Sequence, residues 1–87
     1  MYIVEASQQA QKFLDKLDKN LSERIIERLK KLSEEPIPSD SKFITRDDAG
    51  SKIFRYRIGD YRALYKIKEK EKIVLIANID KRSRVYD

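Results

Sequence analysis

The sequence contains no cysteine and no histidine. Without cysteine the chain forms no disulfide and offers neither a thiolate nucleophile nor a sulfur ligand for a metal. Without histidine it lacks the residue that most often acts as an acid or base near neutral pH and most often binds metals. Any catalysis must therefore proceed without imidazole. Residues 1–5 include no basic segment and begin no long apolar run, so we expect no signal peptide, no membrane span and a cytoplasmic location.

The 87 residues are expected to form one domain, spanning residues 1–87, with a small core. Charge is divided unevenly along this domain. Residues 1–40 hold 7 basic and 8 acidic residues, whereas residues 41–87 hold 13 basic and 7 acidic residues. A field of that sign indicates a polyanionic partner, either a nucleic acid or an acidic protein.

The amino-terminal half has the pattern of a strand followed by two helices. Tyr2–Ala6 is predicted to be a strand, and Ser7 is a suitable N-cap for the first helix. Asn20 and Glu23 resemble a capping box at the start of the second helix, which we expect to continue until Pro36 stops it. The two helices are expected to form an antiparallel pair.

The remaining sequence alternates between apolar and polar residues, as strands with one buried face do. The predicted strands are a short edge strand and three longer ones, namely Lys42–Thr45, Lys52–Ile58, Tyr61–Lys68 and Lys72–Ile79. The fold class is therefore α+β: an N-terminal strand and an antiparallel pair of helices packed on a small, mainly antiparallel sheet.

A hairpin in the basic half carries arginines on one face. Gly59 and Asp60 separate two alternating runs and are typical of a two-residue hairpin loop. With that loop, Arg57 lies directly opposite Arg62, and Arg55 shares their face. Because like charges in opposite positions destabilise a sheet, the arrangement indicates a site that binds an anion.

A second turn, at residues 69–71, is predicted to set the register of the last two strands. This register directs one set of apolar residues toward the helices: Ile73, Leu75, Ala77 and Ile79. Leu64, Val74 and Ile76 then fall on the opposite face. No acidic residue stands opposite the arginines, which favours an anion site over a surface network of ion pairs.

The order of elements and two motifs resemble the RelE/ParE toxin superfamily, and its RelE branch in particular. The first motif covers residues 55–62, where a basic-X-basic strand leads into a Gly-Asp-Tyr-Arg turn, with Tyr65 after it. The second is the terminal Lys-Arg-Ser-Arg-Val-Tyr at residues 81–86. The resemblance spans most of the chain and implies a RelE-like fold.

The resemblance also implies an activity: a toxin that cleaves messenger RNA in the ribosomal A site, without a metal or other cofactor, by attack of the ribose 2′-hydroxyl. Implied partners are the ribosome, messenger RNA and a RelB-like antitoxin that forms a heterotetramer with the toxin; no membrane is involved. The residues that match the catalytic positions of the family are Arg57, Arg62, Arg82 and Tyr86. Those that match RNA-binding positions are Arg55, Lys81 and Arg84.

The chemistry of arginine supports part of this assignment. Guanidinium groups bind phosphate oxygens in pairs and stabilise the charge that develops during cleavage. Because arginine stays protonated near neutral pH, Arg57 is a poor general base, and we expect it to clamp the phosphate or polarise the 2′-hydroxyl.

Two other functions use the same features. A ParE-like inhibitor of gyrase shares the fold without needing the arginine cluster, and an RNA-binding module uses the basic face without cleaving. The basic residues after position 80 also fit a solvated tail.

Overall fold

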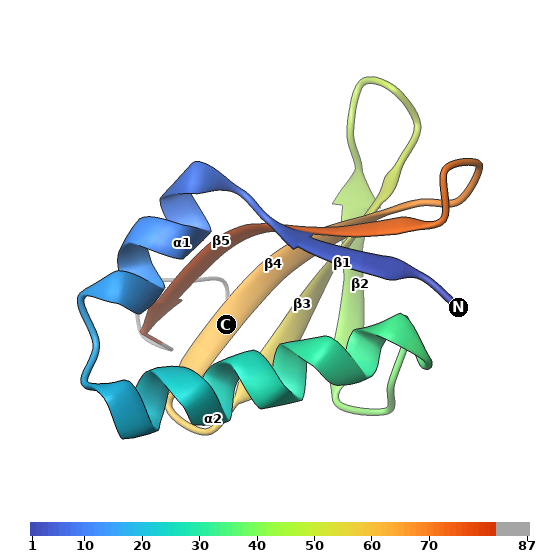
Figure 1. Ribbon diagram of the computed structural model, residues 1–87. Helices are drawn as coiled ribbons and strands as arrows, with labels where there is room; N and C mark the ends of the chain where they lie inside the picture. Colours follow the sequence, from blue (N-terminus) through green and yellow to red (C-terminus); the bar gives the residue numbers. More distant parts are fainter. Residues whose placement is uncertain (82–87) are drawn as a thin grey trace.

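Five strands form one sheet in the order β1-β5-β4-β3-β2 in the computed structural model, which describes residues 1–81. The strands are β1 (Ile3–Ala6), β2 (Ser41–Arg46), β3 (Lys52–Ile58), β4 (Tyr61–Lys68) and β5 (Ile73–Lys81). β1 is parallel to β5, and the other neighbours are antiparallel. Two helices pack on this sheet, with α2 crossing the strands and α1 beside β5 (Figure 1). The predicted α+β fold class is confirmed.

The two helices, α1 (Gln8–Asp15) and α2 (Lys19–Lys30), begin at residues whose side chains cap them. The hydroxyl of Ser7 accepts a hydrogen bond from the backbone N of Ala10, as predicted. At α2 the predicted cap is wrong: the side chain of Asp18, not that of Asn20, caps the helix by accepting from the backbone N of Leu21. Asp18 is the N-cap because its backbone is extended, so the helix begins at Lys19, before Asn20.

After α2 the chain forms one short 3-10 turn, η1 (Lys31–Ser33), before Pro36. Apolar residues from the helices, this turn and one face of the sheet form a single core. Its most deeply buried large side chains are Ile25, Leu32, Tyr65, Val74, Ile76 and Ile79. No helix within residues 1–81 is long and apolar enough to cross a membrane.

The β3–β4 hairpin has the register that its loop predicts. Ile58 pairs with Tyr61 and Arg57 pairs with Arg62, so Gly59 and Asp60 are the two loop residues. Gly59 has a φ of 58°, in the left-handed region that favours glycine. Core residues alternate with Arg55 and Arg57 along β3, which directs these arginines to the sheet face that does not bear the helices.

The predicted register of β4 and β5 is wrong. Lys68 pairs with Ile73, so the turn has four residues, and its last residue, Lys72, has a φ of 59°. A bulge then shifts the pairing: Tyr65 lies opposite Ile76, but Leu64 lies opposite Asn78. The longer turn reverses the expected faces of the first half of β5, and the bulge restores the expected core position of Ile79, which pairs with Ala63.

Two consequences of this register bear on the site and the core. Val74 and Ile76, which we expected on the opposite face, are buried in the core. Arg62 pairs with Asp80, whereas the sequence predicted no acidic residue opposite the arginines. The bulge is stabilised by a residue far away in the sequence, because the hydroxyl of Ser7 donates to the carbonyl oxygen of Ala77 at 2.8 Å.

Candidate functional site

The arginines of the β3–β4 hairpin differ in their exposure. Arg57 is exposed and Arg55 is half-buried. Arg62, directly opposite Arg57, is only 7% exposed and is the one buried charged residue within residues 1–81. A buried guanidinium in a small protein is costly unless charge or hydrogen bonds compensate it. The hairpin therefore presents cations at two depths on one sheet face.

These three arginines line one cleft of about 200 Å³, here called the arginine cleft. Its remaining lining residues are Ser39, Asp40 and Lys42. Lys42 comes from β2, where it pairs with Arg55. The lining thus combines four cationic side chains with one carboxylate and no apolar side chain. Such a lining suits an anion with several oxygen atoms, such as a phosphodiester.

One wall of the cleft is held from the helix side of the sheet by Arg28 of α2. Its Nη2 lies 2.9 Å from Oδ2 of Asp40, and its Nε donates to the hydroxyl of Tyr56 at 3.3 Å. The guanidinium also lies over the Tyr56 ring, 5.4 Å from the centroid. The hydrogen bond to Tyr56 and the charge of Asp40 raise the pKa of Arg28. Because Tyr56 separates Arg55 from Arg57 along β3, this network ties helix, loop and arginine strand together.

The sequence predicts some of these residues and misses others. Of the predicted site residues, Arg55, Arg57 and Arg62 are brought together. Lys81 ends β5, exposed and opposite Tyr61, and does not line the arginine cleft. Arg82, Arg84 and Tyr86 lie outside the described residues.

Lys42 and Asp40 were missed as site residues. The signal for Lys42 was its place in the predicted edge strand. The pairing of that strand with β3, however, depends on a loop and on a register shift between Phe43 and Thr45, neither of which the sequence pattern shows. Within residues 1–81, no three carboxylate side chains gather closely enough to hold a metal ion.

Comparisons with known proteins agree with this geometry. Residues 4–86 match the family model described as the ParE toxin of the type II toxin-antitoxin system, parDE. An archaeal RelE in the RelE–RelB complex from Pyrococcus horikoshii OT3 is 30% identical, with 97% of this chain and 98% of that chain covered and a TM-score of 0.82.

Two further solved structures are similar. A chain of the toxin–antitoxin complex RelBE2 from Mycobacterium tuberculosis is 30% identical, with 93% of this chain and 98% of that chain covered and a TM-score of 0.76. The isolated E. coli RelE toxin is 19% identical, with 93% and 84% covered and a TM-score of 0.75, and it supports the fold alone. No curated protein sequence matches at a significant level.

Proposed function

The chain belongs to the RelE/ParE superfamily of type II toxins, and from that membership we propose that it is an endoribonuclease that cleaves messenger RNA in the ribosomal A site. The observation that carries this proposal is the arginine cleft. It gathers Arg55, Arg57 and Arg62 with Lys42, and no apolar residue lines it. Inhibition of gyrase does not evidently require a phosphate-sized cationic cleft, whereas cleavage of a phosphodiester requires one.

The reaction is a transfer at phosphorus within the RNA chain. The ribose 2′-oxygen bonds to the adjacent phosphorus, the bond from phosphorus to the 5′-oxygen breaks, and a 2′,3′-cyclic phosphate remains. The 2′-hydroxyl loses its proton and the departing 5′-oxygen gains one. During this step negative charge builds up on the phosphoryl oxygens, where guanidinium groups bind it more strongly than in the ground state.

Each arginine has a role that fits its position. Arg62, the buried member of the cleft lining, holds the phosphoryl oxygens, and the exposed Arg57 clamps the phosphate or polarises the 2′-hydroxyl. Neither accepts a proton near neutral pH. Arg82 and Tyr86 complete the catalytic set, with Arg82 neutralising charge and Tyr86 orienting the base. Arg55, Lys81 and Arg84 bind the RNA backbone.

Much of the rate then depends on the ribosome, which holds the message in a geometry suited to attack. Because ribosomes are cytoplasmic, the proposal includes a cytoplasmic location for the toxin. The two similar structures at 30% identity are toxin–antitoxin complexes, RelE–RelB and RelBE2. We therefore propose a RelB-like antitoxin as partner, assembled with the toxin as a heterotetramer.

Primer extension on ribosomes programmed with a defined message tests the proposal. The wild-type chain should cut at in-frame positions only when ribosomes are present, and Arg62→Ala and Arg82→Ala should each slow cleavage by roughly 100-fold or more. Lys70→Ala, at the distant β4–β5 turn, removes one positive charge and should cleave like the wild type.

Other results would overturn the assignment. Intact message with loss of gyrase supercoiling would establish the alternative function, inhibition of gyrase. Ribosome binding without cleavage would indicate that the protein is an RNA-binding module that does not cleave. Full activity of Arg62→Ala would remove this residue from the mechanism.

A further inference from the structure

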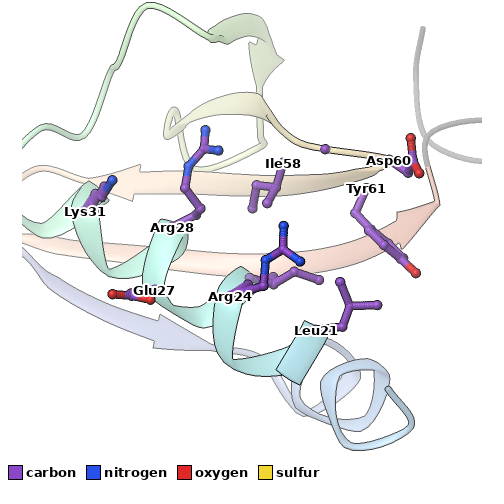
Figure 2. A pocket seen from close by; sticks show the side chains of 10 residues that line it. Leu21, Arg24, Glu27, Arg28, Lys31, Ile58, Asp60 and Tyr61 are labelled. Atoms are coloured by element: carbon purple, nitrogen blue, oxygen red, sulfur yellow. The ribbon is translucent and has the colours of Figure 1, made fainter. Parts of the chain in front are cut away.

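A second depression lies on the helix side of the sheet, between α2 and the β3–β4 hairpin (Figure 2). Its volume is about 590 Å³, larger than that of the arginine cleft. Arg24 and Arg28 extend from α2 toward the strands (Figure 2), and Lys31 is the residue directly after α2, at its C-cap. Gly59 and Asp60, the loop residues of the hairpin, close one end. This depression is called the α2 groove below.

The lining of the α2 groove differs in chemistry from that of the arginine cleft. Four apolar or aromatic residues contribute to it, namely Leu21, Ile25, Ile58 and Tyr61. Its cations are interspersed with the carboxylates of Glu27 and Asp60, which repel phosphate. A partly apolar lining with charges of both signs is typical of a surface that binds a protein segment, whereas RNA favours a cationic one.

Two cations of the groove are available to a partner. Arg28 already contacts Asp40 and Tyr56. The exposed side chains of Arg24 and Lys31 form no ion pair within residues 1–81. They are seven positions apart in the sequence, which corresponds to about 10 Å along a helix. An occupant that complements the groove therefore carries two carboxylates about 10 Å apart with an apolar side chain between them.

We propose that the α2 groove is a docking site for an acidic, amphipathic segment of the antitoxin. This inference rests on the proposed function. Because the arginine cleft opens on the sheet face away from the helices, the groove is a separate point of attachment. A toxin altered in the groove should therefore remain active and escape neutralisation.

The test uses the charge-reversal variant Arg24→Glu/Lys31→Glu and the matched control Lys68→Glu/Lys70→Glu, at the opposite end of β4. Both change the net charge equally. The binding partner is the product of the reading frame adjacent to the toxin gene, and its dissociation constant is measured by titration calorimetry. The groove variant should bind 10- to 100-fold more weakly, and the control should stay within threefold of the wild type. Far-ultraviolet circular dichroism verifies that α2 remains folded.

The possible outcomes separate this inference from the proposed function. Equal weakening of both variants, or wild-type affinity of the groove variant, would overturn the docking site. So would unchanged antitoxin binding combined with weaker binding to ribosomes, which would assign the groove to RNA. The proposed function is judged separately by cleavage with the wild-type chain, and the groove variant should retain that cleavage within threefold.

Discussion

Arg57 and Arg62 stand directly opposite each other across the β3–β4 hairpin, with Arg57 exposed and Arg62 buried. Like charges in this relationship repel each other, and burial of one of them strengthens the repulsion because less water screens it. The repulsion between the two guanidinium groups therefore lowers stability, whatever Asp80, opposite Arg62 on β5, contributes in the other direction. That cost is explained if the site is selected for binding an anion between the two guanidinium groups.

Replacing Arg57 with threonine should stabilise the fold while reducing activity. The change removes the repulsion with Arg62 and introduces a residue that favours strands, so we expect the free energy of unfolding to rise by about 0.2–1 kcal/mol. Cleavage on programmed ribosomes should fall by roughly 10- to 100-fold, because one phosphate-binding group is lost. Urea denaturation and primer extension measure the two effects.

Lys68→Thr is the control for this prediction. Lys68 also lies on a strand, but it pairs with Ile73, which is uncharged. Lys68→Thr therefore introduces a residue that favours strands without removing a repulsion between like charges. Added salt should reduce the stability gain of Arg57→Thr and leave that of Lys68→Thr unchanged. An equal gain in both variants at low salt would assign the effect to strand preference alone.

The extent to which the sequence predicts this site depends on the range of the interactions. The pairing of Arg57 with Arg62 follows from two adjacent loop residues, Gly59 and Asp60, because a two-residue loop leaves one register. Arg55 and Arg57 lie on the same face of the sheet because side chains alternate along one strand. Both are local rules, and both predictions are confirmed.

The register of β5 depends on contacts that no local pattern shows. The turn at residues 69–72 is one residue longer than expected and reverses which side chains of β5 face the core, and the bulge near Ala77 then reverses them back. That bulge is supported by the hydroxyl of Ser7, 70 residues earlier in the chain. Asp80 therefore reaches the position opposite Arg62 unexpectedly. In the same way, Lys42 and Asp40 enter the arginine cleft only through the pairing of β2 with β3.

Asp40→Asn should strengthen binding of RNA. The substitution removes the one carboxylate that lines the arginine cleft and releases Arg28 from its ion pair. We expect a short labelled RNA to bind about two- to fivefold more tightly at low salt, as measured by fluorescence anisotropy. Loss of the Arg28 ion pair should cost no more than about 1 kcal/mol of stability, because both partners are partly exposed.

Asp48→Asn gives the matched comparison, since it changes the net charge equally in the exposed loop between β2 and β3. If both variants tighten RNA binding to the same degree, the effect comes from net charge, and the carboxylate of Asp40 has no special position.

The loop between β2 and β3 should lose stability in acid through Asp47. Its Oδ2 accepts from Nζ of Lys66 at 3.0 Å, and its Oδ1 accepts from the backbone N of Ala49 and of Ser51. The hydrogen bond from Lys66, followed by that from Ser51, lowers the pKa of Asp47. The stabilisation is therefore fully present above the ordinary carboxyl pKa of about 3.9 and is lost as pH falls through the lower, folded-state value.

Urea denaturation between pH 2 and pH 7 checks this expectation. Asp47→Asn should be less stable than the wild type at neutral pH, and the difference should shrink below pH 4. Asp48→Asn changes the adjacent, exposed carboxylate and should follow the wild-type profile. A difference between Asp47→Asn and the wild type that stays constant with pH would refute the role of the charge.

Tyr65 should make the fold sensitive to alkali. The residue is fully buried, its hydroxyl donates to the carbonyl oxygen of Pro36 at 2.6 Å, and burial raises its pKa to about 12. Folding therefore favours the neutral phenol: its contribution to stability is complete below about pH 10, the unfolded value, and is lost as pH rises toward 12. Tyr65→Phe should cost about 1 kcal/mol at pH 7 through the lost hydrogen bond. From pH 10 upward the stability of Tyr65→Phe should approach that of the wild type. The control Tyr61→Phe should not show this convergence. Parallel urea-denaturation profiles of Tyr65→Phe and the wild type would disprove the role of Tyr65 ionisation.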